Sequence, residues 1–364
     1  TLDMGPEIAV FVPRGVGNAF QTLVDGTAYS YLVNDHWSPA ARDSYTFVNL
    51  ADDDLAINWP IPLGQAELSP ADRSHPRLSS VSPMSPPKQL ILGANGQLGR
   101  ALVAAFPQAD AATRQELDLS DRKAMAEFDF SRYGTVLNAA AYTKVDAAET
   151  ESGRRSAWAV NVHATAALVS AAREQRCTLV QISSDYVFDG SIHVHDETEP
   201  FSPLGVYGQT KAAADALVGT VPAHYVLRSS WVIGDGPNFV RTMASLADRG
   251  ASPRVVHDQH GRLTFTNEIA RAIIHLLQTG APYGTYNLTN AGPSMTWADI
   301  ARSVFVARGR PQSAISNVTT EEYGSGKSLA PRPRHSVLNL DKLVATGFRP
   351  TDAGAELDRY LTKL

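Results

Sequence analysis

An apolar strand that runs directly into three regularly spaced glycines, and then into a helical pattern, limits the folds open to this sequence. The run Gln89 to Leu92 leads into Gly93-Ala94-Asn95-Gly96-Gln97-Leu98-Gly99, and helical spacing continues to residue 106. Glycines at such a junction permit a tight turn, let the backbone approach a pyrophosphate and bring the helix close to the sheet. The helix start offers free N–H groups and a positive dipole to phosphates. A glycine-rich turn without a ligand is the alternative, and it is weakened by the position at the first strand-to-helix junction.

Beyond this junction, short apolar strands alternate with segments of helical spacing. Strands are expected at 89–93, 135–140, 178–183, 224–229 and 284–288, and helices at 97–106, 121–127, 154–175, 204–218, 238–248, 266–279 and 296–308. Strands that alternate with helices need crossover connections and therefore form a parallel sheet. We expect an α/β fold with a Rossmann-type doubly wound parallel sheet and a smaller C-terminal substrate lobe.

Residues 1 to about 63 follow a different pattern, with apolar and polar positions in alternation. The short runs are Ile8 to Val12, Phe20 to Val24, Thr27 to Val33 and Ser44 to Leu50. Asp25-Gly26 supplies the positive φ angles that a two-residue hairpin turn needs. Serine and proline between 79 and 88 interrupt regular structure. We expect an antiparallel β segment over 1–78, a linker over 79–88, and the α/β domain over 89–364, with its substrate lobe formed mainly by 232–364.

Composition excludes several classes of function. The 37 acidic residues outnumber the 32 Lys and Arg residues, so the formal net charge is −5 and no basic surplus exists for nucleic acid. The longest apolar stretches fall far short of the roughly 18 residues that a membrane helix requires. Cys177 is the single cysteine and cannot form an internal disulfide. The first residues lack the features of a secretory signal, so we expect a cytoplasmic protein without nucleic-acid or membrane partners.

An arginine lies where the ribose of a bound dinucleotide is recognised. Thr113-Arg114 follows Gly93 by about 20 residues, and an arginine at that distance accommodates a 2′-phosphate. We therefore predict NADPH as cofactor. NADH is the alternative if the second strand ends earlier and Asp110 takes this place. A solvated surface charge is the other interpretation of Arg114.

Three residues combine into a candidate hydride-transfer site. Tyr207 and Lys211 are four residues apart in a helical segment and project from one face. The ammonium is expected to favour the phenolate and to lower the pKa of Tyr207 toward the working range. Ser184 follows the strand 178–183, at the sheet edge where parallel sheets place ligands. It can hydrogen-bond the same carbonyl oxygen that Tyr207 protonates.

Longer strings carry a resemblance to a known family. They are Gly93 to Gly99, Asn138-Ala-Ala-Ala-Tyr-Thr-Lys-Val-Asp-Ala-Ala-Glu149, Ser183-Ser-Asp-Tyr-Val-Phe188, Val206-Tyr-Gly-Gln-Thr-Lys211 and Arg228-Ser-Ser-Trp-Val232. Over residues 88–364 the chain resembles the dTDP-4-dehydrorhamnose reductases, which are extended short-chain dehydrogenases. The resemblance implies NADPH-dependent reduction of the C4 ketone of dTDP-4-dehydro-6-deoxy-L-mannose to dTDP-L-rhamnose. The substrate is then a nucleotide sugar, with dTDP or UDP left open, and a homodimer is one assembly that it allows.

The same resemblance implies roles for single residues. Tyr207 is the general acid, Lys211 binds the nicotinamide ribose, and Ser184, where the family usually has threonine, polarises the C4 carbonyl. The expected cofactor-binding residues are Gly93, Gly96, Gln97, Leu98, Gly99, Arg114, Asp118, Leu119, Ala141, Tyr142, Thr143, Tyr207 and Lys211. The expected substrate-binding residues are Ser184, Asp185, Trp231 and Arg262, the last because a guanidinium suits a diphosphate.

Two alternatives accompany this interpretation. Dehydratases of the same superfamily carry an Asp-Glu pair after the strand-end hydroxyl, whereas this chain has Asp185-Tyr186, which argues against a dehydratase. The regulatory subunit of methionine adenosyltransferase is similar to the reductase family, so a non-catalytic NADP-binding subunit is the second alternative. The intact Ser184, Tyr207 and Lys211 favour an enzyme.

The N-terminal segment has a resemblance of its own. Its strings are Val12-Pro-Arg-Gly15 with Ala19-Phe-Gln21, Tyr31 to Pro39, Leu55-Ala-Ile-Asn-Trp-Pro60 and Leu68-Ser-Pro-Ala-Asp72. They resemble the second half of dTDP-4-dehydrorhamnose 3,5-epimerase, a cupin-like or jelly-roll-like barrel, which implies a bifunctional epimerase/reductase. Asp72 matches an Asp that polarises a catalytic His, but Trp37 replaces a proton-donating Tyr and Asn18 replaces a His. An indole N–H has no usable pKa, so we expect a β module without epimerase activity in this chain, and leave open whether upstream residues complete it.

Other polar residues carry weaker signals. His193 and His195 lie beside Asp196 and Glu197 and could chelate a metal, but such loop residues are usually solvated, and no metal is expected. Cys177 is expected to be a small buried hydrophobe. Arg332 and Arg334 are further basic residues of the substrate lobe.

Overall fold

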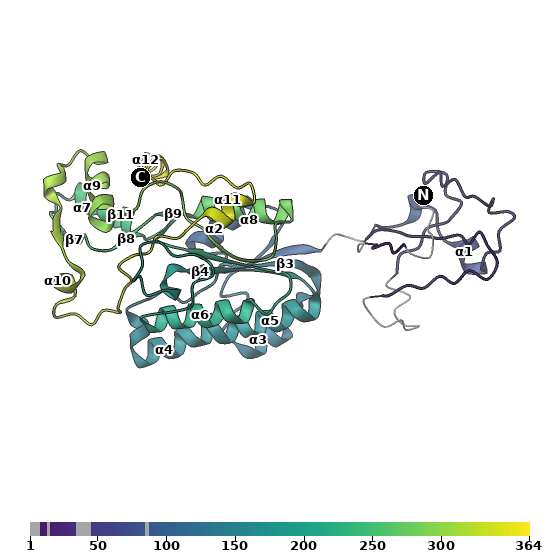
Figure 1. The fold of residues 1–364 in the computed structure, drawn as a ribbon, viewed down its shortest axis with the longest axis horizontal. Coiled ribbons are helices and arrows are strands. Elements are labelled where there is room, and N and C mark those ends of the chain that lie inside the picture. Colours follow the sequence, from purple (N-terminus) through teal and green to yellow (C-terminus); the bar gives the residue numbers. More distant parts are fainter. Residues whose placement is uncertain (1–7, 13–14, 34–44, 84–86) are drawn as a thin grey trace. The chain divides into compact units, whose positions relative to one another are not determined.

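The chain forms two compact units, Thr1–Pro86 (unit 1) and Pro87–Leu364 (unit 2), in a computed structural model that describes residues 8–12, 15–33, 45–83 and 87–364 (Figure 1). In its described residues, unit 1 has one short helix, α1 (Pro70–Ser74), a 3-10 turn over Leu78–Ser80, and no strand. A turn is present at Asp25-Gly26, with Gly26 at a φ of 75°, but the described residues beside it form no strand, so the predicted hairpin stays a prediction. The antiparallel sheet predicted for this unit stays a prediction, and Ser44 and Trp37 lie outside the described residues.

Unit 2 is built on a six-stranded sheet with the strand order β10-β5-β4-β3-β1-β2. The strands are β1 (Lys88–Leu92), β2 (Asp110–Ala112), β3 (Tyr133–Asn138), β4 (Thr178–Ser184), β5 (His224–Ser229) and β10 (Gly284–Asn287). All neighbouring pairs run parallel. The chain places β2 on one side of β1 and β3 on the other, so a topological switch point lies at their carboxyl ends, where such sheets bind ligands.

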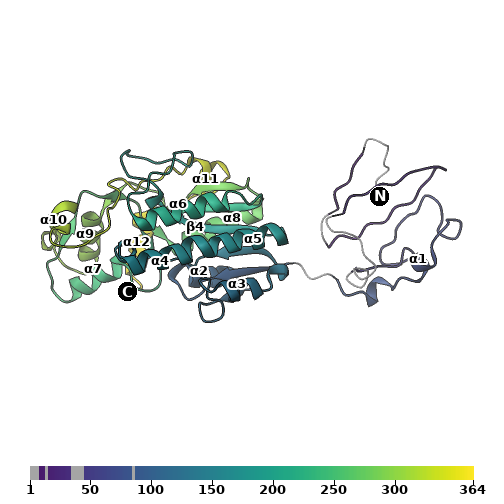
Figure 2. The same ribbon diagram turned by 90° about the horizontal axis from the view of Figure 1, so that it is seen from below.

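Helices cover both faces of this sheet, so the predicted doubly wound α/β fold is confirmed (Figures 1 and 2). One face carries α3 (Arg122–Glu127), α4 (Glu151–Trp158), α5 (Ala164–Gln175) and α6 (Val206–Val218), and the other carries α2 (Gln97–Ala105), α8 (Thr266–Thr279) and α11 (Asp341–Ala345). Leu90 and Leu92 belong to the apolar cluster on the first face, whereas Ile91 belongs to the cluster on the second. A strand with both faces buried must be apolar at successive positions, which explains the run before the glycines.

The C-terminal lobe has its own apolar core, which includes Val240, Phe305 and Leu357. Its helices are α7 (Phe239–Asp248), α9 (Trp297–Ala307), α10 (Thr320–Gly324) and α12 (Ala353–Leu361), and its paired short strands are β6 (Val232–Ile233) with β9 (Thr264–Phe265), β7 (Arg254–Val256) with β12 (Ser316–Val318), and β8 (His260–Gly261) with β11 (Met295–Thr296). Between these segments the chain returns to the sheet as α8 and β10. Among the residues that the structure describes, no helix is long and apolar enough to cross a bilayer.

Candidate active site

The glycine turn after β1 leaves no room for side chains. Gly93 has a φ of 76°, and a Cβ there would lie 2.8 Å from the backbone of Ala140. A Cβ on Gly99 would lie 2.1 Å from the carbonyl oxygen of Gly93. The backbone therefore requires glycine at both positions. α2 begins at Gln97, so Gly99 lies in its first turn, where the backbone N–H groups are unpaired. This backbone cradle suits a dinucleotide diphosphate.

Two residues that follow Gly96 contribute in different ways. The Gln97 side chain is engaged with the loop after β6, because its Oε1 accepts from the Gly234 N–H at 3.1 Å and its Nε2 donates to the Pro237 carbonyl at 3.1 Å. The Leu98 side chain is buried in the core beside α8. Leu98 can therefore face phosphates only with its backbone.

The residues after β2 place an arginine at the edge of the cofactor region. β2 ends at Ala112, and the exposed Arg114 donates from Nε to Asp118 Oδ2 at 3.1 Å. Asp110 begins the strand instead of ending it, and its carboxylate accepts from Lys88 Nζ at 2.9 Å and from the Tyr133 hydroxyl at 3.0 Å. These bonds hold the pKa of Asp110 below its usual value. Asp110 therefore lies at the start of β2, where its carboxylate is already bonded to Lys88 and Tyr133. The side chain of Leu119, which follows Asp118, is buried.

The structure brings Ser184, Tyr207 and Lys211 together at the carboxyl edge of the sheet. Ser184 ends β4, and Tyr207 and Lys211 lie in the first two turns of α6. The Lys211 ammonium donates to the Ile182 carbonyl at 2.6 Å, which fixes the face of α6 that meets β4. The Ser184 hydroxyl lies close enough to the Tyr207 phenol to lower its pKa. The three residues predicted from two separate segments therefore lie at one place in the fold.

The expected effect of Lys211 on Tyr207 is wrong for this structure. The pKa of Tyr207 is raised, first by burial and then by the carboxylates of Asp185 and Asp215, and the hydrogen bond with Ser184 only partly opposes this. Burial also lowers the pKa of Lys211 to about 8. The ammonium is engaged with a backbone carbonyl, so burial and the nearby carboxylates dominate the phenol. Tyr207 therefore holds its proton at neutral pH.

A buried ion pair lies behind Lys211. Asp215, one turn further along α6, accepts from Arg228 Nε at 3.0 Å, and both side chains are almost fully buried. The Arg228 guanidinium also packs over the rings of Phe188 and Phe201. The negative charge of Asp215 raises the pKa of Lys211 and so favours its charged form. The pair thus links α6 to β5 directly beneath the cluster.

Asp185 is a buried carboxyl next to Ser184. The Ser184 hydroxyl donates to Asp185 Oδ1 at 2.9 Å, and Asp185 Oδ2 is buried without a hydrogen-bond partner. Burial raises the pKa of Asp185 to about 6, against the opposing effect of hydrogen bonds from Ser336 and Ser184. At acidic pH the protonated Asp185 no longer has to accept from Ser184, which frees the Ser184 proton for another acceptor.

The sequence prediction missed Asn161. The predicted helix 154–175 is interrupted by a π-helical turn over Ala159–His163, a feature that often marks functional sites. Asn161, in that turn, accepts from the Tyr142 N–H at 2.8 Å and donates to Thr210 Oγ1 at 2.9 Å. It therefore ties the loop after β3 to α6. The apolar pattern of 154–175 is continuous and carries no signal of this turn.

The loop after β3 contains the remaining predicted cofactor residues. Tyr142 is half-buried in the small cluster that also includes Tyr207, Ala141 is half-buried, and Thr143 is exposed. At the end of the same loop, Asp146 accepts both guanidinium Nη2 bonds of Arg332, at 2.8 and 2.9 Å. This ion pair fixes the C-terminal segment beside the site.

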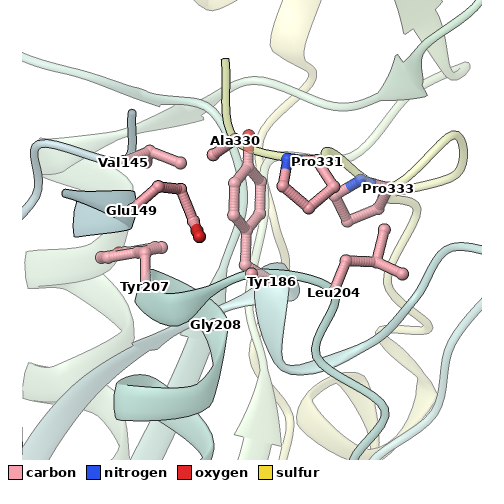
Figure 3. A pocket seen from close by; sticks show the side chains of 10 residues that line it. Val145, Glu149, Tyr186, Leu204, Tyr207, Gly208, Ala330, Pro331 and Pro333 are labelled. Atoms are coloured by element: carbon pink, nitrogen blue, oxygen red, sulfur yellow. The ribbon is translucent and has the colours of Figure 1, made fainter. Parts of the chain in front are cut away.

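The fixed segment closes a small pocket next to Tyr207 (Figure 3). The ring of Tyr186 stands between the Glu149 side chain and the rings of Pro331 and Pro333. Tyr186 and Tyr207 meet edge to face, with ring centroids 5.7 Å apart. The pocket volume of about 10 Å³ holds roughly one water molecule. Tyr207 is therefore closely packed on this side.

Trp231 and Arg262 both lie in the lobe, but Arg262 lines a second pocket that does not include Ser184, Tyr207 or Lys211. Trp231 has a φ of 46°, which is costly for a large side chain, and such strain clusters at functional sites. Its indole stacks on Trp297 with centroids 3.9 Å apart, and a Cβ on Gly261 would lie 2.8 Å from its ring. Arg262 is among the residues that line a second pocket and donates from Nη1 to the Leu338 carbonyl at 3.0 Å. Arg334 is exposed.

His195 is placed differently from a free metal ligand. It is buried, with Nδ1 2.7 Å from Glu199 Oε2 and Nε2 3.0 Å from the His335 carbonyl oxygen. Both ring nitrogens are therefore occupied. Cys177 is buried, as predicted, and burial raises its thiol pKa.

Comparisons with known proteins match both units. Residues 88–364 match the family described as RmlD substrate binding domain, and residues 1–80 match dTDP-4-dehydrorhamnose 3,5-epimerase. A dTDP-4-dehydrorhamnose reductase of Aggregatibacter actinomycetemcomitans is 36% identical over 284 residues, which cover 72% of this chain and 94% of the relative. The spore coat polysaccharide biosynthesis protein SpsK of Bacillus subtilis is 35% identical over 285 residues, 75% of this chain and 96% of the relative.

A solved structure gives a similar result for the fold. The dTDP-4-dehydrorhamnose reductase of Bacillus anthracis in complex with NADP is 30% identical, with a TM-score of 0.70. The match covers 77% of this chain and 100% of that chain.

Proposed function

The chain belongs to the dTDP-4-dehydrorhamnose reductase family, and we propose that residues 88–364 use NADPH to reduce the C4 ketone of dTDP-4-dehydro-6-deoxy-L-mannose to dTDP-L-rhamnose. The observation that carries the proposal is the cluster of Ser184, Tyr207 and Lys211 at the carboxyl edge of the sheet, with the glycine turn at the same edge. The family match does not favour the alternative of a non-catalytic regulatory subunit.

The chain offers a fitting place for the cofactor. The turn from Gly93 to Gly99 would hold the diphosphate with backbone N–H groups, and Arg114 would meet a 2′-phosphate. A solved relative binds NADP, which supports NADPH over NADH. When bound, NADPH supplies the hydride that reduces C4.

Tyr207 supplies the proton. Because its pKa is raised, the phenol is protonated at neutral pH and can donate to the ketone oxygen as negative charge develops there. Lys211, held at the same sheet edge by its bond to the Ile182 carbonyl, would bind the nicotinamide ribose, and solvent returns a proton to Tyr207. Ser184 donates a second hydrogen bond to the same oxygen when its hydroxyl turns away from Asp185.

Unit 1 is proposed to be catalytically silent. By the epimerase resemblance, Asn18 and Trp37 stand where proton-transfer residues are expected, and Trp37 lies outside the described residues. Asp72, the matched acid, lies in the first turn of helix α1, where its Oδ2 accepts from the Ser69 hydroxyl at 2.6 Å. Its Oδ1 lies 3.5 Å from His75 Nε2, and His75 stacks on Phe47. This local capping role explains Asp72 without an epimerase reaction.

The test is NADPH consumption, followed by its absorbance, with two substrates offered separately. One is the dTDP-4-keto-6-deoxy-glucose precursor, and the other is the same precursor treated beforehand with an independent 3,5-epimerase. Turnover only after treatment is the expected result. Turnover with both substrates would mean that unit 1 epimerises the sugar.

Absence of turnover with both substrates would contradict the reductase assignment and revive the regulatory subunit. The matched UDP sugar, offered in parallel, decides the base of the nucleotide. A homodimer and a cytoplasmic location stay predictions from the sequence.

A further inference from the structure

A second, larger pocket of about 390 Å³ lies in the C-terminal lobe. Its lining comes from four separate segments and includes His193, His260, Arg262, Ser294 and His335. A pocket of this volume accommodates a small organic ligand. None of the residues assigned to hydride or proton transfer lines it, whereas Arg262, which the sequence predicted to bind the substrate diphosphate, does.

The pocket lies on the opposite face of two strands from the catalytic cluster. Successive residues of an extended strand point to opposite faces. Ser336 is close enough to Asp185 to lower the pKa of its carboxyl, whereas the neighbours of Ser336, His335 and Val337, line the pocket. In the same way Gly261 packs against Trp231, whereas His260 and Arg262 line the pocket. Hydrogen bonds between His260 and the 334–336 segment, both 2.7 Å long, hold the two strands side by side.

The polar lining of the pocket is cationic or neutral. The rings of His193 and His335 have centroids 4.3 Å apart, and those of His260 and His335 lie 5.4 Å apart. Arg262 Nε is buried without a hydrogen-bond partner. No carboxylate is among the lining residues.

Carboxylates near the pocket are engaged elsewhere. Asp352, which faces Gly292 at the pocket rim, caps α12 by accepting from the Ala355 N–H at 2.9 Å. Glu199 is paired with the buried His195. Asp352 stays negatively charged at the rim, but no carboxylate lines the pocket itself, where the permanently charged side chain is Arg262.

The neighbouring basic groups make His335 harder to protonate. Its pKa is lowered by burial first, and then by His193, His260, His195 and Arg334. A bound anion would oppose the effects of these cations and raise the pKa again. Binding of an anion and protonation of His335 are therefore coupled.

The chemistry of the donors selects the class of ligand. Among the described residues, no group of three His, Cys, Asp or Glu side chains has a geometry that could hold a metal ion. A guanidinium beside imidazoles suits a phosphate, because both supply directional N–H donors. We propose that this pocket is a second ligand site, which binds a phosphate-bearing small molecule through Arg262, His260 and His335.

The experiment is a titration of the full chain, loaded with NADPH, with inorganic phosphate against sodium chloride of matched ionic strength. Thermal unfolding reports binding, because a ligand of the folded state raises Tm with concentration. We expect phosphate to raise Tm beyond chloride, and to bind about tenfold more weakly in H260N and in H335N. H163N, at an exposed histidine of the π-helical turn, is the matched control and should behave as the unaltered chain.

Titration of the His335 ring by NMR gives a second readout that does not depend on stability. Phosphate should raise the pKa of this ring, and binding should be stronger at pH about 6 than at pH about 8. Thymidine monophosphate, run in parallel, distinguishes a nucleotide from free phosphate as the source of the anion. A Tm response to either compound that survives unchanged in H260N and H335N would place binding elsewhere and overturn the proposal. No response beyond chloride would overturn it as well.

Discussion

The two units differ in how they bury their apolar side chains. In unit 2, Leu90, Ile91 and Leu92 are almost fully buried, because helices of the same chain cover both faces of the sheet. In the described residues of unit 1, large apolar side chains stay in water, with Phe11 84% and Tyr31 71% exposed. An alternating pattern favours a strand, but a strand gains stability only from a paired neighbour and a covered face. Unit 2 therefore has a complete apolar core, whereas the apolar side chains described in unit 1 are not covered by other residues.

The largest expected effect concerns chemistry, which the account places entirely in unit 2. Tyr207→Phe removes the proton donor and should lower kcat about 10²- to 10⁴-fold. Steady-state NADPH oxidation measures it, with NADPH affinity and Tm as controls that should stay unchanged. Asp72→Asn, in unit 1, is the matched variant and should leave kcat unaltered. A large loss in Asp72→Asn would move part of the chemistry to unit 1.

Removal of a buried arginine should cost far more in unit 2 than removal of an exposed one in unit 1. Arg228→Met leaves the buried Asp215 without its hydrogen-bonded cation and should lower the free energy of unfolding by about 3–5 kcal/mol. Arg77→Met breaks an exposed pair with Asp53 at 3.8 Å and should cost less than about 1 kcal/mol. Denaturant unfolding measures both variants. The double variant Arg228→Met with Asp215→Leu should recover stability, and a lack of recovery would contradict the role of the buried charge.

Asp185 should make the stability of unit 2 depend on pH. Its pKa is about 6 in the folded state and 3.8 ordinarily, so the folded protein binds this proton more tightly. The resulting stability is complete below pH about 4 and is lost as the pH rises through about 6, to a total of about 3 kcal/mol at most. Asp185→Asn should remove this dependence. Denaturant unfolding of the unaltered chain and of Asp185→Asn measures the dependence. The same pH dependence in both proteins would contradict the role of Asp185.

The smallest effect is expected on the surface of unit 1. Phe11→Ala removes a ring that is already in water, so the free energy of unfolding should change by less than about 0.5 kcal/mol. Phe305→Ala, in the core of the lobe, should cost about 3–5 kcal/mol. A cost of several kcal/mol for Phe11→Ala would show that Phe11 is covered in solution.

The sequence predicted the parts of unit 2 in which local pattern and final environment agree. The glycine turn, the apolar strands and the pair Tyr207 and Lys211 all follow from spacing that a single segment displays. β2 has only three residues, too few for a periodic signal, and the short strands of the lobe share this limit.

The remaining features depend on contacts between distant segments. Asn161 hydrogen-bonds Tyr142 and Thr210 from a π-helical turn, and nothing in the local sequence pattern predicts that turn. The pKa of Tyr207 is set by burial and by Asp185 and Asp215, so its spacing from Lys211 predicted the wrong direction. The histidine pocket draws on four segments, so no single stretch of sequence reveals it.

The most direct test of the account compares the full chain with residues 87–364 alone, on substrate that an independent epimerase has already converted. The measured quantity is kcat/KM for NADPH-dependent reduction, with Tm of both proteins as the check on folding. The account predicts values that agree within about twofold, because the core and the catalytic cluster both lie in unit 2. A folded 87–364 fragment that fails to reduce the substrate, beside a full chain that succeeds, would contradict it.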